Sequence, residues 1–262
     1  MSRPATPDPL PDALERIDEI RERARGRPLA VFLDYDGTLS PTADRPDLAT
    51  LPEAMREAVA ALSGKATVAI VSGRDLRNLR HLISIPGIFY VGSHGFEMEG
   101  PDGRRLDDDP GGRCLPALGR AEDELHEALD GIPGSLVERK RFSVAVHYRL
   151  VSAEDRPAIE QAVSTALARH GELRRADGKM VYELRPAVEW DKGTAVLRLL
   201  EILGGDPLPV YVGDDITDED AFRALQSRGV GVVVSEERRP TAATYRLHGT
   251  DAVRSLLQEL AG

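Results

Sequence analysis

A short apolar run, Leu29–Leu33, leads directly into the sequence Asp-Tyr-Asp-Gly-Thr at residues 34–38, and this junction constrains the fold most strongly. The run has the length and apolarity of a buried parallel strand. Gly37 permits a tight turn at the carboxyl end of that strand, which is where open α/β sheets bind ligands. Two carboxylates spaced i and i+2 at that edge suit phosphoryl transfer and metal binding. The same residues also suit a polar turn that caps a helix, and the motif alone does not separate the two interpretations.

Three further segments place polar groups at the ends of apolar runs or at the start of a helix. They are Ser72-Gly73-Arg74 after the run Thr67–Val71, Asp191-Lys192-Gly193 before a helix over 194–203, and the acidic residues 213–220 after a run at 210–212. Each segment by itself is weakly specific. In this order, with residues 34–38, they resemble the haloacid-dehalogenase-like phosphohydrolases. The resemblance implies an α/β fold, with a Rossmann-like core on a parallel sheet and an inserted α+β cap domain.

The resemblance and the chemistry of the side chains together assign catalytic roles in this core. Asp34 is the expected nucleophile, because a carboxylate is ionised at neutral pH and forms an acyl phosphate that water can hydrolyse. Asp36 is the expected general acid for the leaving oxygen and then the base for water. Ser72 would hold phosphoryl oxygens, and Lys192 would neutralise charge shared between Asp34 and the phosphoryl group. Arg74 either binds phosphate or is a surface residue or ion-pair partner.

Magnesium is the expected cofactor. Mg²⁺ takes oxygen ligands in octahedral geometry. One carboxylate oxygen of Asp34, the backbone carbonyl of Asp36 and the carboxylate of Asp214 fit that requirement.

The remaining acidic residues of the last segment have less certain roles. Asp218 is interpreted equally well as an outer group of the metal site and as a carboxylate at the positive end of a helix dipole. For Glu219 and Asp220 the dipole interpretation is favoured. Asp215 is expected to orient Lys192.

Composition excludes several classes of function. The formal net charge of −10 argues against nucleic acids and anionic membranes as main partners. The single cysteine, Cys114, excludes an internal disulfide. Residues 1–28 contain no apolar core of a signal peptide, and no apolar run is long enough to span a bilayer. We therefore expect a cytoplasmic protein that makes no membrane contact, and we take a monomer as the default state.

Changes in pattern along the chain predict two domains. The core is expected over residues 1–110 and 187–262, with 1–28 as an N-terminal extension that contains an amphipathic helix over 12–24. The cap is expected over residues 111–186. Its predicted elements are a helix over 117–129, strands over 135–140 and 142–150, a helix over 153–170 and a hairpin over 172–184.

Charged cap strands supply the candidates for substrate recognition. Alternation places Glu138 and Lys140 on one face of their strand, and Glu183 and Arg185 on one face of theirs. Mixed carboxylates and cations suit a polyhydroxylated ligand, because sugar hydroxyls both donate and accept hydrogen bonds. An ordinary solvated face with cross-strand ion pairs is the commoner use of such strands, and physical reasoning alone favours it.

A second resemblance changes this balance. The motifs Gly-Ser-His-Gly-Phe-Glu at 92–97, Glu-x-Lys-x-x-Ser-x-x-x-His-Tyr-Arg at 138–149 and Gly-Lys-x-Val-x-Glu-x-Arg-Pro at 178–186 are similar to those of the trehalose-6-phosphate phosphatases. The family implies a small-molecule sugar phosphate as the substrate. It also implies sugar-contacting residues, namely Glu138, Lys140 and Glu183 from the cap, His94 and Gly95 from the core, and Lys179 or Arg185 in support.

Two other functions remain open. One is a phosphatase of the same superfamily that acts on a different sugar phosphate, of the sucrose-phosphate or mannosyl-phosphoglycerate type. The other is a catalytically silent sugar-phosphate sensor. The presence together of Asp34, Asp36, Lys192 and Asp214 argues against a silent protein, which needs none of them.

Overall fold

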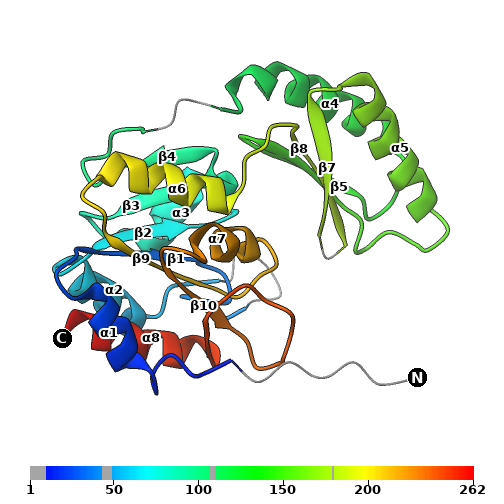
Figure 1. The fold of residues 1–262 in the computed structure, drawn as a ribbon. Helices are drawn as coiled ribbons and strands as arrows, with labels where there is room; N and C mark the ends of the chain where they lie inside the picture. The colour runs from blue at the N-terminus through cyan, green and yellow to red at the C-terminus, as the bar shows by residue number, and fades with distance from the viewer. Residues whose placement is uncertain (1–9, 43–48, 107–109, 179) are drawn as a thin grey trace, which may run out of the picture. The chain divides into compact units, whose positions relative to one another are not determined.

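A seven-stranded sheet forms the centre of the first of two units into which the chain divides (Figure 1). The computed structural model describes residues 10–42, 49–106, 110–178 and 180–262. The first unit comprises Met1–Leu106 and Trp190–Gly262, and the second comprises Asp107–Glu189. In sequence, the second unit is therefore an insertion in the first. It begins four residues before the expected cap and ends three residues after it.

The strands of the first unit follow the order β11-β10-β9-β1-β2-β3-β4 across the sheet. Every neighbouring pair is parallel except β3 and β4, which are antiparallel. The strands are β1 (Leu29–Leu33), β2 (Thr67–Val71), β3 (Phe89–Gly92), β4 (Glu97–Glu99), β9 (Leu208–Gly213), β10 (Val230–Val234) and β11 (Tyr245–Leu247). This mostly parallel sheet confirms the predicted α/β core.

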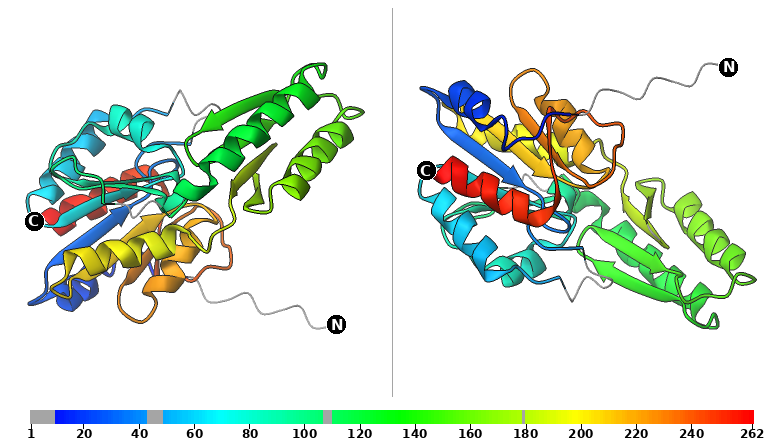
Figure 2. Two further views of the ribbon diagram at one scale, coloured as in Figure 1. Left: turned by 90° about the horizontal axis from the view of Figure 1, so that it is seen from above. Right: turned by 90° about the horizontal axis from the view of Figure 1, so that it is seen from below.

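Helices cover both faces of this sheet. They are α1 (Ile17–Ala24), α2 (Glu53–Ser63), α3 (Leu76–Ile83), α6 (Lys192–Leu203), α7 (Asp218–Leu225) and α8 (Gly249–Ala261). Apolar residues of α1, α2, α3 and α8 pack in one core cluster, and those of α6 and α7 pack in another. Figure 2 shows α6 and α8 on opposite faces.

Alternation along the strands explains the two clusters. In β1, Val31 and Leu33 belong to the cluster with α8, whereas Ala30 and Phe32 belong to the cluster with α6. Successive side chains of a strand point to opposite faces, so a strand between two helical layers is apolar at every position. This arrangement produces the continuous apolar runs that are visible in the sequence.

The order of the strands places the functional edge at β1. From β1 the chain continues to β2 on one side, and β9 adds later on the other side. Ligands of open α/β sheets bind outside the carboxyl ends of the strands at such a reversal. Asp34 follows β1 directly, so its side chain begins at this edge.

The N-terminal helix is shorter than the sequence pattern predicts. It begins at Ile17 and not at Asp12. The preceding residues bond to the sheet edge instead, since Ala13 donates its N–H to the carbonyl of Arg246 at 2.9 Å and Asp12 forms an isolated bridge with Arg246. Backbone hydrogen bonds made to the edge are not available for a helical turn.

The second unit contains a separate four-stranded antiparallel sheet, with the strands in the order β5-β6-β8-β7. Its elements are α4 (Leu115–Leu129), β5 (Leu136–Lys140), β6 (Ser143–His147), α5 (Arg156–Arg169), β7 (Leu173–Gly178) and β8 (Val181–Pro186). Apolar residues of α4 and α5 pack with Val144, Val146 and Leu184 of the sheet. Side chains that alternate with these, such as Glu183, therefore lie on the other face.

Transmembrane helices are not found in the part of the chain that the structure describes. No helix there combines the length and the apolarity that a bilayer crossing requires.

Candidate active site

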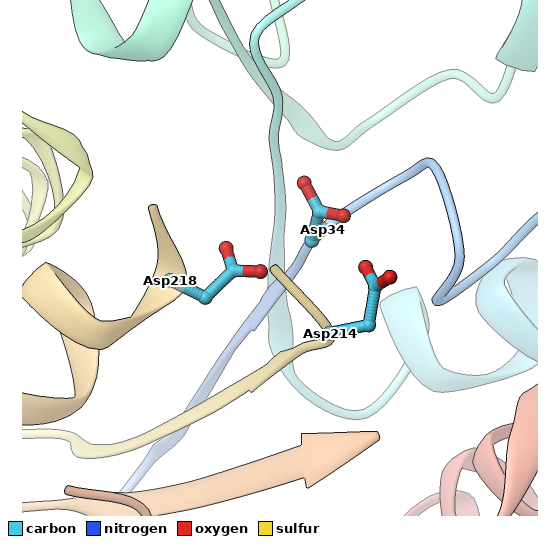
Figure 3. A group of neighbouring side chains, drawn as sticks. All are labelled: Asp34, Asp214 and Asp218. Carbon is cyan, nitrogen blue, oxygen red and sulfur yellow. The ribbon is translucent and has the colours of Figure 1, made fainter. Parts of the chain in front are cut away.

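Three aspartates meet at the carboxyl edge of the first sheet. Asp34 follows β1, Asp214 follows the adjacent strand β9, and Asp218 is the first residue of α7 (Figure 3). The Asp34 N–H donates to the carbonyl of Val212 at 2.9 Å, which ties the ends of the two strands together. One carboxylate oxygen from each aspartate lies within 4.8 Å of the other two. The strand register therefore brings residues 180 positions apart into one acidic group.

Lys192 places a buried ammonium group in this acidic cluster. It is the first residue of α6, whose N-terminus is capped by Asp191, and it is 3% exposed. Lys192 Nζ lies 2.7 Å from Asp34 Oδ1 and 2.7 Å from Asp218 Oδ1. Burial would lower the pKa of Lys192, but the charges of Asp34 and Asp218 outweigh it and raise that pKa. The lysine is therefore a fixed positive charge beside the expected nucleophile.

Asp218, rather than the expected Asp215, is the residue that contacts Lys192. Besides the lysine, Asp218 Oδ1 accepts a hydrogen bond from the Tyr211 hydroxyl at 2.6 Å, and Asp218 Oδ2 accepts one from the Asp215 N–H at 2.8 Å. The Asp215 carboxylate instead accepts from the Thr217 hydroxyl at 3.3 Å. Both Asp218 oxygens are thus used within the protein, which suits an outer group of a metal site better than a direct ligand.

Tyr211 was not predicted from the sequence to belong to this site. It occupies an apolar strand whose other residues are aliphatic or small, and its hydroxyl is hidden in that pattern. Burial raises the pKa of Tyr211 well above its ordinary value, so the hydroxyl remains a hydrogen-bond donor to Asp218. A tyrosine near the end of a strand that leads into an acidic motif is the signal by which it could have been found.

The balance of charge in this group favours a divalent cation. Three carboxylates lie around one ammonium group, so the fully ionised site carries an excess of negative charge. Burial raises the pKa of Asp34 well above its ordinary value, with Asp218 and Asp214 adding to the effect of burial. Burial and the charges of Asp218 and Asp215 raise the pKa of Asp214 to about 6. Hard oxygen donors with unbalanced charge fit Mg²⁺, and Asp34 and Asp214 are the residues that would hold it.

Gly37 is required for this close assembly. Its φ of +84° lies in the left-handed region, and a Cβ atom at this position would overlap the carboxylate of Asp214. The turn after Asp36 therefore approaches Asp214 as closely as a backbone can.

Asp36 is held by Arg74 and is not a member of the group of three aspartates. Arg74 Nε and Nη2 donate to the two Asp36 carboxylate oxygens at 2.7 and 2.6 Å. The guanidinium also lies 5.3 Å from the ring centre of Tyr35. Burial would lower the pKa of Arg74, but the hydrogen bonds and charge of Asp36 raise it. The sequence left open whether Arg74 binds phosphate, lies at the surface or forms an ion pair. The structure shows an ion pair with Asp36.

His94 lies against the loop that contains Ser72. The buried Ser72 carbonyl accepts the His94 N–H at 2.9 Å, and its hydroxyl accepts the Arg74 N–H at 3.2 Å. A Cβ atom on Gly73 would come 2.6 Å from the His94 ring. The following Gly95 packs equally tightly, because a Cβ there would come 2.8 Å from Trp190 Nε1. The expected phosphate-binding and core sugar-binding residues are therefore neighbours.

The expected sugar-contacting residues of the second unit also form one group. Glu138 and Glu183 are both paired with Ala145 of the strand between them, so they lie on one face of the sheet. Lys140 Nζ lies 3.0 Å from Glu183 Oε1, and Arg185 Nε donates to Glu183 Oε2 at 2.7 Å. We call Glu138, Lys140, Glu183 and Arg185 the charged cap face. Lys179 lies outside the described residues.

Electrostatics keeps both glutamates of the charged cap face ionised. Burial would raise the pKa of Glu183, but the charges of Arg185 and Lys140 outweigh it and lower that pKa to about 2. A hydrogen bond to His147, 2.8 Å from Glu138 Oε2, lowers the pKa of Glu138. Both carboxylates are thus hydrogen-bond acceptors at neutral pH.

Comparisons with known proteins agree with the motifs. The trehalose-phosphatase family pattern matches residues 32–251. The chain is 39% identical over 264 residues to probable trehalose-phosphate phosphatase D of Arabidopsis thaliana. The aligned region covers 95% of the chain and 72% of that protein. It is 42% identical over 259 residues to trehalose-phosphate phosphatase of Mycobacterium tuberculosis. That aligned region covers 96% of the chain and 66% of the relative.

A solved structure shows the same fold. The C-terminal domain of Candida albicans trehalose-6-phosphate phosphatase superposes with a TM-score of 0.76 at 23% identity, over 97% of this chain and 98% of that one. The family pattern spans most of the chain and both units, and it confirms the resemblance predicted from the motifs. The chain belongs to the trehalose-phosphatase family.

Proposed function

We propose that the protein hydrolyses trehalose 6-phosphate to trehalose and inorganic phosphate, with magnesium as cofactor and an aspartyl phosphate on Asp34 as intermediate. The observation that carries the proposal is the buried contact of 2.7 Å between Lys192 Nζ and Asp34 Oδ1 inside an acidic group. A merely structural ion pair would not need Asp214 beside it, since a third charge in a buried site adds repulsion.

The first chemical step transfers the phosphoryl group to the protein. An oxygen of Asp34 forms a bond to phosphorus as the bond between phosphorus and the sugar oxygen breaks. Asp36, held in place by Arg74, gives a proton to that leaving oxygen. Lys192 stabilises the negative charge that Asp34 and the phosphoryl oxygens share, and Ser72 holds those oxygens.

The second step returns the protein to its starting state. Water attacks the phosphorus of the aspartyl phosphate while Asp36 takes up a proton, and Asp34 leaves as a carboxylate with release of phosphate. A magnesium ion held by Asp34 and Asp214 would supply positive charge that reduces repulsion between these carboxylates and the phosphoryl group.

The charged cap face is proposed to recognise the sugar. Its ionised carboxylates accept hydrogen bonds from sugar hydroxyls, and Lys140 and Arg185 donate to sugar oxygens. The names of the relatives, which act on trehalose phosphate, favour this disaccharide among sugar phosphates.

A phosphate-release assay tests the proposal. We expect turnover of trehalose 6-phosphate with Mg²⁺, its loss in EDTA, and slower turnover of sucrose 6-phosphate and glucose 6-phosphate. Asp34→Asn should lose turnover and keep its circular dichroism spectrum, because the amide has nearly the same shape and is a poor nucleophile. Turnover by folded Asp34→Asn at the wild-type rate would contradict the assigned nucleophile, and preference for another sugar phosphate would contradict the substrate.

A further inference from the structure

Glu97 contacts three parts of the first unit, namely the start of α3, the turn at Ser93–Gly95 and Arg105, and it has no role in the mechanism proposed above. It lies on the edge strand β4 and its side chain is 4% exposed. We propose that Glu97 is a positioning residue, which holds the phosphate-binding loop at Ser72–Arg74 and the turn at Ser93–Gly95 in register for the phosphate of the substrate. The inference rests on the proposed phosphatase function and adds to it a residue that touches neither the reacting atoms nor the expected metal ligands.

The first observation is the set of contacts that Glu97 makes. Oε2 accepts a hydrogen bond from the Ser93 hydroxyl at 2.9 Å and another from the backbone N–H of Leu76 at 3.1 Å. Oε1 faces the Arg105 guanidinium at 3.3 Å. Leu76 is the first residue of α3, and it follows the phosphate-binding loop by two positions. One carboxylate oxygen thus joins the start of that helix to the turn.

The second observation is the conformation of the turn. Ser93 and His94 have φ values of 51° and 56°, so two consecutive residues that are not glycine occupy the left-handed region. This region is unfavourable for such residues and persists only where the surroundings enforce it. The bond from Ser93 to Glu97 is a side-chain contact that enforces it.

The third observation is that the turn and the loop are directly bonded. Ser93 donates its N–H to the carbonyl of Arg74 at 2.6 Å, and His94 donates its N–H to the carbonyl of Ser72 at 2.9 Å. Because the His94 ring also packs on Gly73, a shift of the turn would move both the ring and the loop backbone. Glu97 can therefore fix the positions of the phosphate-binding residues without contacting the phosphate itself.

Affinity for inorganic phosphate tests this role without requiring turnover. Phosphate binding is measured by calorimetry in Mg²⁺ buffer for wild type, Glu97→Gln and Glu97→Ala. Glu97→Gln keeps the shape and an acceptor oxygen, so we expect a few-fold weaker binding. Glu97→Ala leaves the Ser93 hydroxyl and the Leu76 N–H without this acceptor, so we expect roughly tenfold weaker binding, and a matching rise in KM for p-nitrophenyl phosphate.

Glu99 provides a matched control. It lies two residues farther along β4, its side chain is 10% exposed, and it pairs with Arg80 of α3 at 2.7 Å. Glu99→Gln therefore removes a similar charge contact to the same helix and leaves the turn untouched. We expect a lower melting temperature with unchanged phosphate affinity.

Two outcomes would overturn the inference. One is wild-type phosphate affinity in folded Glu97→Ala, and the other is an equal loss of affinity in Glu99→Gln. If wild type binds phosphate but fails to hydrolyse any sugar phosphate, the proposed function fails while the affinity comparison still decides the role of Glu97.

Discussion

Arg74 holds Asp36 through both carboxylate oxygens, at 2.7 Å from Nε and 2.6 Å from Nη2. This fork matches the planar geometry of a guanidinium, which a lysine cannot reproduce. The expected general acid is therefore fixed in one orientation before substrate arrives. The contact gives Arg74 a task distinct from phosphate binding, and the two tasks affect different kinetic constants.

Arg74→Lys separates these tasks. If Arg74 mainly orients Asp36, kcat should fall about tenfold or more while KM and the inhibition constant of phosphate change little. Steady-state kinetics with product inhibition measures all three quantities. Arg77→Lys, at an exposed position of α3, is the control and should behave as wild type. A rise in KM and in the phosphate inhibition constant at unchanged kcat would show that Arg74 binds phosphate instead.

The raised pKa of Asp214 predicts a pH dependence of stability. Between the ordinary pKa of 3.8 and the folded value of about 6, the folded protein binds more protons than the unfolded chain. The free energy of unfolding of the metal-free protein should therefore fall as pH rises through this window, by at most about 3 kcal/mol. Bound Mg²⁺ offsets the repulsion between ionised Asp214 and the neighbouring carboxylates, so it should raise the melting temperature more at pH 7 than at pH 5.

Thermal unfolding from pH 4.5 to 7.5, in EDTA and in Mg²⁺, measures this effect. Asp214→Asn is the control, because it cannot ionise at this position. Its melting temperature should depend less on pH between 4.5 and 6 and should respond weakly to Mg²⁺. An equal response of wild type to Mg²⁺ at pH 5 and pH 7 would count against Asp214 as a metal ligand.

Tyr211→Phe tests the chain of contacts behind Lys192. The change removes the hydroxyl that donates to Asp218 at 2.6 Å and retains the ring, which packs edge-on against Phe222 at 5.6 Å. We expect the fold to persist and kcat to fall roughly three- to tenfold, because Asp218 then holds Lys192 less firmly. Tyr245→Phe, which removes a hydroxyl bonded to Glu19, should leave kcat unchanged. Equal rates for both variants would remove Tyr211 from the site.

The positions that the sequence predicted best are those set by strand ends. Asp34 and Asp214 meet because parallel strands end at one edge, and a short apolar run followed by an acid marks that edge without knowledge of the partners. Their catalytic roles remain predictions. The fold class follows from the same runs and is confirmed by the sheet.

Contacts that depend on side-chain direction could not be predicted in this way. Asp215 and Asp218 are three residues apart at the start of α7, and only the path of the loop decides which of them faces Lys192. Glu97 is hidden for a different reason, since its partners come from α3 and from a left-handed turn that no strand or helix pattern specifies. The early start assigned to α1 failed because bonding to Arg246 is a tertiary contact.

Alanine variants of Glu138, Lys140 and Glu183 test whether the charged cap face recognises the sugar. Each should lose kcat/KM for trehalose 6-phosphate by about 1–3 kcal/mol, roughly tenfold to a hundredfold, because a sugar hydroxyl loses its partner. For p-nitrophenyl phosphate, which has no sugar, the loss should be far smaller. Glu122→Ala is the control, since it breaks a pair with Arg139 on the helical side of β5. It should not lower kcat/KM for trehalose 6-phosphate more than kcat/KM for p-nitrophenyl phosphate. Equal losses on both substrates, or none on either, would return these three residues to the role of a solvated sheet face.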